Sequence, residues 1–343
     1  MNLAEIKAYL LALPAIERSN VIKELQGMEQ DGSILPKCQQ MRRNILDNKQ
    51  GVCPHCGHSK YVKFGYKSGS QRYKCKSCKR SFTEYSGTWM AGIHHKKKID
   101  DYMQLMLEEK SLDKIKEELD INKKTAFDWR HKILSSVSTT DKDGFTGITE
   151  SDETFFLHSE KGKPVETRKP RKRGGSSSKS GINDDHIAVI VTQDRKKQID
   201  LTVATKGRIK KIDIDKAIGL RLTKQTILCS DSHVSYKGFA MDNELEHHPL
   251  RSDLKERIKE DVYHIQHVNS THNKLKKWID NRFWGVSTKY LQQYLNWYRL
   301  KEMLKGSNEL VKDFAEKSVE DIEAILRYRQ ITDSYQNIIS TQF

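Results

Sequence analysis

The sequence predicts a mixed α/β domain preceded by a four-cysteine ribbon and a group of short helices. Two Cys-x-x-Cys pairs indicate the ribbon, and apolar residues at helical spacing over 96–137 indicate the helices. From residue 145, strand-like runs alternate with helical ones and end in a long helix, which is typical of an α/β sheet domain. The 343 residues are enough for two or three domains of this kind.

Positive charge dominates the composition. The chain has 61 Lys and Arg against 46 Asp and Glu, a net charge of +15, which favours a phosphate-rich partner such as nucleic acid. An anionic membrane surface is the alternative, but the sequence has no long apolar run, and its first residues carry acids where a signal peptide needs a basic head. We therefore expect no membrane partner and a soluble, cytoplasmic protein.

The ribbon is predicted over residues 49–90. Cys53 and Cys56 precede Cys75 and Cys78 by a spacing typical of a four-cysteine zinc site, with a hairpin-like segment between the pairs. Two unrelated pairs or a redox motif are weaker interpretations, because a redox pair needs no second pair at this distance. We expect one structural Zn²⁺ that supplies most of the stability of so small a unit.

Basic and aromatic residues alternate within the ribbon, which indicates either a solvated surface or, as we favour, a DNA-contact face. The basic candidates are Lys63, Lys67 and Arg72, and the interleaved aromatics are Tyr61, Phe64, Tyr66 and Tyr73.

Residues 91–140 are predicted to form a helix-turn-helix domain, with a small helical segment of unassigned role before the ribbon (1–48). A short break, "DINKK", separates the second and third predicted helices. The last helix would enter the major groove of DNA, with candidate contacts from Lys123, Lys124, Thr125 and Arg130. The periodicity alone also fits an ordinary helical bundle.

The α/β domain is predicted over 145–305. Strands are expected at "GFTGITESDETFFLH", "HIAVIVTQD", "QIDLTVATKG" and "QTILCSD", with a helix at "KIDIDKAIGLRL". A polar, basic stretch after the first strand contains Arg171, Lys172 and Arg173, which either hold backbone phosphates of DNA or are simply solvated. Aromatic residues of the last helices, including Tyr290 and Trp297, are expected to be core.

The ordered set of motifs resembles a family. The ribbon, the helix-turn-helix, "ESDETFF", "LCSDSHVSY", "HVNSTHNKLKKWI" and "GVSTKYLQQYLNWYR" are similar to the Merlin-related, zinc-ribbon group of bacterial insertion-sequence transposases, over residues 50–300. The resemblance implies an ISXO-like, DDE-type catalytic domain with an RNase H-like fold, followed by a helical tail (306–343). It also implies double-stranded DNA partners (terminal inverted repeats and target), a homodimer or larger oligomer on DNA, and a location at the nucleoid.

Catalytic carboxylates are implied at Asp152 and Asp231. Two such acids on neighbouring strands bridge two Mg²⁺ or Mn²⁺ ions about 4 Å apart, which activate the attacking oxygen and stabilise the leaving one. Strand alternation places Glu150, Asp152 and Thr154 on one face and Glu153 on the other. Asp231 ends a buried strand, where α/β sheets place their ligands.

The third ligand departs from the family's usual glutamate. His272 shares a helical face with Val268, Leu275 and Ile279, and Asn269 borders that face as the alternative ligand. A lone histidine on an apolar face is more often a core residue, but here the face must pack near the two aspartates. Lys276, with Lys277 as its rival, is placed to hold a DNA phosphate.

These features predict a DNA transposase that binds its terminal inverted repeats and carries out metal-dependent strand cleavage and transfer. Two alternatives stay open. One, favoured by the missing third acid, is a catalytically inactive zinc-ribbon DNA-binding regulator. The other is an RNase H-like, structure-selective nuclease that cleaves without joining.

Overall fold

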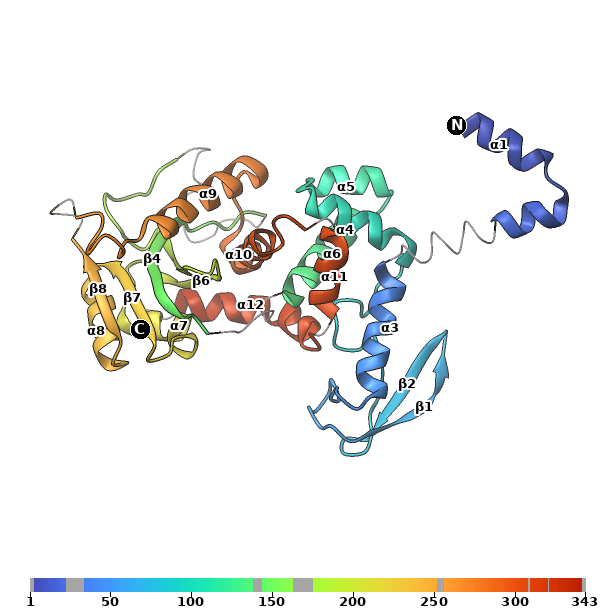
Figure 1. The fold of residues 1–343 in the computed structure, drawn as a ribbon, viewed down its shortest axis with the longest axis horizontal. Coiled ribbons are helices and arrows are strands. Elements are labelled where there is room, and N and C mark those ends of the chain that lie inside the picture. Colours follow the sequence, from blue (N-terminus) through green and yellow to red (C-terminus); the bar gives the residue numbers. More distant parts are fainter. Residues whose placement is uncertain are drawn as a thin grey trace.

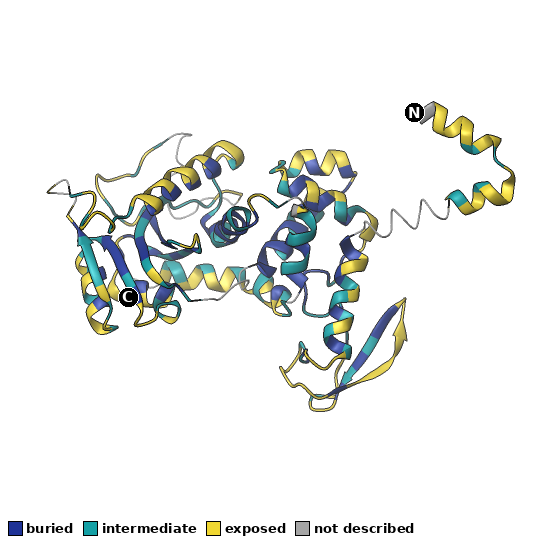
Figure 2. Cartoon of the chain, in the orientation of Figure 1, coloured by how far each residue is buried: buried dark blue, intermediate teal, exposed yellow. Residues whose placement is uncertain are grey.

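The computed structural model describes residues 3–22, 34–137, 144–162, 175–251, 254, 256–307, 309–319 and 321–340. A sheet domain and a helical bundle lie side by side, and a small three-stranded ribbon is attached to the bundle next to helix α3 (Ile34–Asp47), as Figure 1 shows. Helix α1 (Leu3–Ala12) projects away from the rest, and most of its residues are exposed (Figure 2). The predicted basic residues Arg171, Lys172 and Arg173 lie outside the described residues.

The large sheet has five strands in the order β6-β5-β4-β7-β8. Their bounds are β4 (Gly147–Leu157), β5 (His186–Asp194), β6 (Ile199–Lys206), β7 (Thr226–Asp231) and β8 (Glu246–Leu250). β5 runs antiparallel to both β4 and β6, whereas β4, β7 and β8 are mutually parallel. The four predicted strands are confirmed, and β8 is an additional edge strand.

Strand alternation gives the sheet two buried faces. Ala188 and Ile190 of β5 pack with α7 (Lys211–Ile218) and α8 (Val234–Asp242). Val189 and Val191 of the same strand point to the other face, into a core shared with α9 (Gln266–Phe283) and α10 (Thr288–Met303). The sheet is therefore sandwiched between helices, as the alternation of strands and helices predicts.

The three predicted helices of the bundle are α4 (Ile99–Leu107), α5 (Leu112–Leu119) and α6 (Lys123–Ser136). Asp120 adopts a left-handed backbone (φ 45°) that ends α5, and the Asn122 side chain caps α6 by accepting from Lys124 N. α3 (Ile34–Asp47) and α11 (Leu310–Val319) pack onto this bundle.

Helix α12 (Ala324–Ser340) joins the bundle to the sheet, because it contacts both α6 and β6. Arg327 Nε donates to Ser135 O of α6, whereas Tyr335 OH hydrogen-bonds His158 just after β4. One continuous apolar core runs from the bundle to the α9 face of the sheet and includes Trp297, so the prediction that the aromatics of this region are core is confirmed.

The ribbon consists of β1 (Tyr61–Lys67), β2 (Ser70–Cys75) and β3 (Ser81–Thr83). Ser68 and Gly69 between the first two strands both have positive φ (48° and 76°), as a tight hairpin of this type requires. Tyr61 and Tyr73 pack against Phe82 in the ribbon's own core, and Tyr61 OH donates to Leu46 O of α3.

Two sequence-based assignments are wrong because of this packing. Tyr61 and Tyr73 are 3% and 0% exposed, so of the four interleaved aromatics Phe64 and Tyr66 are the two at the surface. Arg130, predicted to contact DNA, is 2% exposed: its guanidinium donates to Lys110 O and lies over the Trp297 ring. A cation buried between helices cannot reach a phosphate, so Arg130 stabilises the bundle instead.

Candidate active site

Asp152 and Asp231 approach each other across neighbouring parallel strands. The β4–β7 register pairs Glu150 with Cys229, and two residues further along each strand lie the two aspartates. The intervening Ser151 points to the opposite face, where its hydroxyl hydrogen-bonds Thr192 and Tyr236. At the end of β7, Asp231 Oδ1 accepts from His233 N at 3.0 Å, which fixes the turn into α8.

The carboxylates of Asp152, Glu153 and Asp231 lie close enough together to repel one another. Burial raises the pKa of Asp152 well above its ordinary value, and the charges of Glu153 and Asp231 raise it further. Burial and Asp231 also raise the pKa of Glu153 to about 7, although strand alternation assigned Glu153 to the other face. The position of Lys276 allows its charge to lower the pKa of Asp152, but one lysine does not balance three acids.

Helix α9 presents His272 to these acids. Val268, Leu275 and Ile279 are buried on the same face, as predicted, and His272 is 8% exposed. His272 Nδ1 lies 4.0 Å from Asp152 Oδ2. Asn269, the predicted alternative ligand, is exposed. The geometry therefore favours His272 over Asn269, and Lys276 over Lys277, since only the charge of Lys276 acts on Asp152 and His272.

The imidazole of His272 is suited to a metal ion. Burial and the nearby charge of Lys276 lower the pKa of His272 to about 4, so the ring is neutral at physiological pH. His272 Nε2 is buried and has no hydrogen-bond partner among the described residues, and the same holds for Glu153 Oε2. A neutral imidazole with an unpartnered Nε2, beside repelling carboxylates, is a donor set that a divalent cation would stabilise.

Glu150 holds the start of α9, a role that sequence reasoning missed. Its carboxylate is 1% exposed and accepts from His267 N (2.9 Å) and Val268 N (3.2 Å), the free amides of the helix N-terminus. Arg195 pairs with the same carboxylate at 2.7 Å. This anchor sets the position of α9 on the sheet and hence of His272 relative to Asp152.

Glu150, His264 and His267 also have donor atoms close enough together to hold a metal ion. However, Arg195 donates to His264 Nε2 at 3.1 Å and occupies the Glu150 oxygen that a metal would need. The cluster is therefore better explained as a set of contacts that holds the β5–β6 turn against the start of α9. The spacing of His264 and His267 is the signal in the sequence that could have pointed to it.

The four ribbon cysteines converge as predicted. Cys53 Sγ lies 3.8 Å from Cys78 Sγ, and Cys56 Sγ lies 3.7 Å from Cys75 Sγ. All four sulfur atoms lie within 4.8 Å of one another. A tetrahedral ion with Zn–S bonds of about 2.3 Å has sulfurs about 3.8 Å apart, so these thiols fit Zn²⁺.

We expect the Cys53→Ser variant to lose zinc and, with it, the folded ribbon, because binding of a structural zinc supplies folding free energy. Metal analysis of the purified protein measures the first effect, and binding to the element's end DNA measures the second. Cys38→Ser, a matched change at a buried cysteine outside the ribbon, should retain zinc. Wild-type protein purified without zinc would contradict the assignment.

Most of the predicted DNA-contact residues lie at the surface. Lys63 and Lys67 are exposed on β1, and Arg72 is half-buried over the Phe64 ring. Lys123 and Lys124 are exposed and Thr125 half-buried at the start of α6, whereas the rest of that helix is largely covered. Only the first turn of α6 is thus free for DNA, and recognition helices contact bases with that end.

Comparison with known proteins shows what the sheet domain is similar to. Residues 144–301 match the ISXO2-like transposase domain. This region contains Asp152, Asp231 and His272. A relative from Halobacterium salinarum, described as an uncharacterized protein in transposable element ISH50, is 24% identical over 290 residues, which span 79% of this chain and 92% of the relative. The relative is archaeal, so the resemblance extends beyond bacterial elements.

Among solved structures, the chain is similar to the Mos1 transposase in a pre-cleavage transpososome, with 12% identity and a TM-score of 0.27 over 71% of this chain and 80% of that one. The Mos1 strand transfer complex gives 12% identity and a TM-score of 0.24, with the same coverage. Both scores are too low to define a common fold.

None of the described helices is both long enough and apolar enough to cross a membrane.

Proposed function

We propose that this protein is a DNA transposase that cleaves and joins DNA strands at the ends of an insertion sequence. The observation that carries the proposal is the meeting of Asp152, Asp231 and His272 beside the adjacent strands β4 and β7, inside the region that matches a transposase domain. The strand order, with β5 antiparallel to its neighbours, supports an RNase H-like catalytic domain.

In this proposal Asp152, Asp231 and His272 hold two Mg²⁺ or Mn²⁺ ions, and Glu153 adds negative charge beside them. Bound there, the metal would activate the attacking water or 3′ hydroxyl and stabilise the leaving oxygen. The imidazole in place of a carboxylate favours Mn²⁺, which accepts nitrogen ligands more readily than Mg²⁺. Lys276, exposed beside Asp152, orients the scissile strand by pairing with a phosphate.

The ribbon and the first turn of α6 would bind the terminal inverted repeats. Lys63, Lys67, Arg72, Lys123, Lys124 and Thr125 supply the contacts, and the stretch with Arg171, Lys172 and Arg173 adds phosphate contacts. Because two ends must be joined, the active form would be a dimer or larger assembly on DNA. Membership of the Merlin-related group and a nucleoid location in a bacterium belong to the same proposal.

A strand-transfer assay tests this function. The full chain is incubated with DNA that carries the element's own ends and a target plasmid, in Mg²⁺ or in Mn²⁺. We expect cleaved ends and joined products, with more product in Mn²⁺. End binding without any cleavage would indicate a DNA-binding regulator, and cleavage without joining would indicate a structure-selective nuclease.

A further inference from the structure

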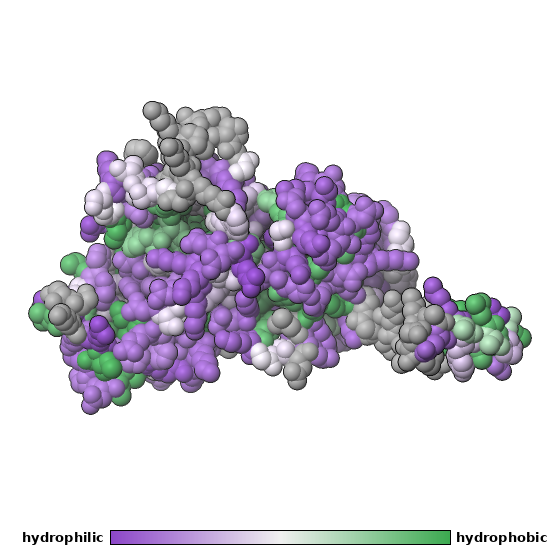
Figure 3. All heavy atoms as spheres, turned by 90° about the horizontal axis from the view of Figure 1, so that it is seen from above, coloured by the Kyte–Doolittle hydropathy of each residue, from purple (hydrophilic) through white to green (hydrophobic). Residues whose placement is uncertain are grey.

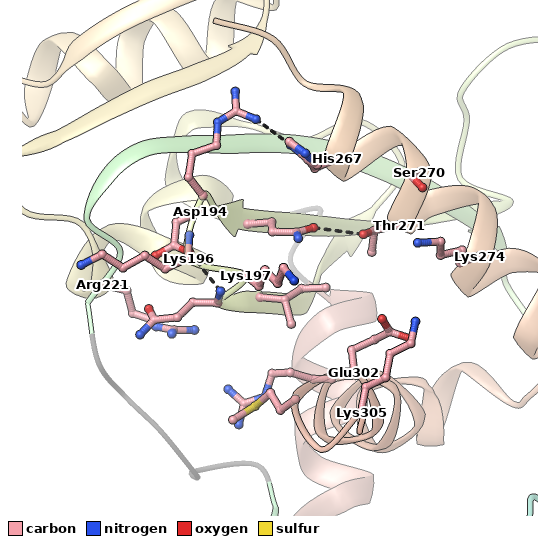
Figure 4. A pocket seen from close by; sticks show the side chains of 16 residues that line it. Asp194, Lys196, Lys197, Arg221, His267, Ser270, Thr271, Lys274, Glu302 and Lys305 are labelled. Atoms are coloured by element: carbon pink, nitrogen blue, oxygen red, sulfur yellow. Dashed lines mark hydrogen bonds between the residues drawn. The ribbon is translucent and has the colours of Figure 1, made fainter. Parts of the chain in front are cut away.

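A basic hollow lies beside α9, next to the β5–β6 turn. Its volume is about 850 Å³, and its walls come from the β5–β6 turn, the first half of α9 and the end of α10 (Figure 4). Ser270, Thr271 and Lys274 of α9 line it, and Thr271 Oγ1 donates to Gln193 of β5 at 3.1 Å. His272, the residue after Thr271, points toward Asp152.

Cationic side chains dominate the lining. Lys196 and Lys197 extend from the β5–β6 turn, Lys274 from α9 and Lys305 from the chain after α10. All four are exposed, and none forms an ion pair with any residue in the described ranges. Arg195 and Arg221 add positive charge, although they already pair with Glu150 and Asp200. Mutually repelling lysines around one hollow form a site for an anion with several charges.

The acids of the lining do not neutralise these lysines. Asp194 is 4% exposed, and its Oδ1 accepts from Lys196 N and Gln198 N inside the turn. Glu302 is the other acid that lines the hollow. The net charge of the lining is therefore positive. Hydrophilic residues also cover most of the face of the molecule seen in Figure 3.

The residue types of the lining indicate which kind of anion the hollow would bind. It contains no Phe, Tyr or Trp on which an unpaired base would stack, so single-stranded DNA is a poor fit. Lysines on separate elements suit the spaced phosphates of a duplex backbone, and lysine contacts to phosphates carry no sequence information. The hollow thus fits double-stranded DNA of any sequence.

We propose that this hollow binds the backbone of target DNA. The inference rests on the proposed function, because a transposase must hold a target of varied sequence as well as its own ends. Helix α9 would then border both the target duplex and the Asp152–Asp231–His272 site at which the target strand is joined.

A triple variant, Lys196→Gln/Lys197→Gln/Lys274→Gln, tests the proposal in the full chain. Lys216→Gln/Lys224→Gln/Lys237→Gln is the matched control, since it removes the same charge from exposed lysines on the α7–α8 side of the sheet. Each protein is measured for binding to an end-free duplex over a range of salt concentrations, for binding and cleavage of the element's end, and for strand transfer into a plasmid.

In the triple variant we expect strand transfer to fall at least tenfold while end binding and end cleavage stay at the control's level. The salt dependence of duplex binding should weaken by about one unit of log–log slope for each lysine that holds a phosphate. Unchanged transfer and slope would overturn the proposal, and a parallel loss of end cleavage would assign the hollow to the transposon end instead. If the wild-type protein cleaves no DNA, the proposed function fails, but the end-free duplex still tests whether the hollow binds DNA.

Discussion

Asp152→Asn and Asp231→Asn should each reduce end cleavage and strand transfer by about 10³-fold or more, with binding to the end DNA nearly intact. Each change keeps the size of the side chain but removes a negative charge from the proposed metal site. Asp242→Asn, an identical change at an exposed position on α8, is the control and should leave both reactions unchanged. Joining at the wild-type rate by either variant would exclude that aspartate, and Glu153, the acid beside Asp231, would be tested next.

The thermal stability of the Asp152→Asn variant provides an independent test of the proposed metal site. The raised pKa of Asp152 means that the folded protein holds this proton more tightly than the unfolded chain, so ionisation at neutral pH costs stability. Asp152→Asn should therefore leave the melting temperature unchanged or raise it in metal-free buffer. Added Mn²⁺ should stabilise the wild type but stabilise the variant much less, since only a bound ligand shifts the unfolding equilibrium. A large drop in the metal-free melting temperature would indicate a structural role instead.

His272→Ala should abolish or greatly slow joining with only a small loss of stability, about 1 kcal/mol, because the ring nitrogens make few contacts. His272→Glu restores a carboxylate at the third position, so it should keep some activity and shift the preference from Mn²⁺ toward Mg²⁺. Strand transfer in each metal and thermal unfolding are the measurements.

Asn269→Ala is the control for His272. Asn269 lies on the same helix but is exposed, so its loss should leave joining unchanged. If Asn269→Ala eliminates joining while His272→Ala remains active and stable, Asn269 is the ligand. If His272→Ala unfolds the protein, the His272→Glu variant still separates a ligand from a core residue, since only a ligand role predicts a change in metal preference.

Local patterns in the sequence were sufficient for most of the sheet domain. The alternation around Asp152 and the buried run before Asp231 each indicate a strand, and both strands formed where predicted. The cysteine spacing likewise reports a local geometry, and the four sulfurs converge. In these cases the signal and the structural element lie within a few residues of each other.

Long-range packing accounts for what the sequence did not reveal. Arg130 has the pattern of a surface residue on a recognition helix, but Trp297, far along the chain, covers it. Glu150 is separated by 117 residues from the helix start that it holds, and neither segment alone indicates the other. The pKa of Glu153 depends on Asp231 of the adjacent strand, although its place in the alternation suggested the opposite face.

The shared core between the bundle and the sheet has a geometric consequence. Helix α12 contacts α6 of the bundle and β6 of the sheet, and the apolar core continues between them. If the first turn of α6 binds DNA, the distance from that contact to Asp152 is set by packed helices and not by a flexible linker. The number of base pairs between the sequence that the protein recognises and the bond that it breaks would then be constant.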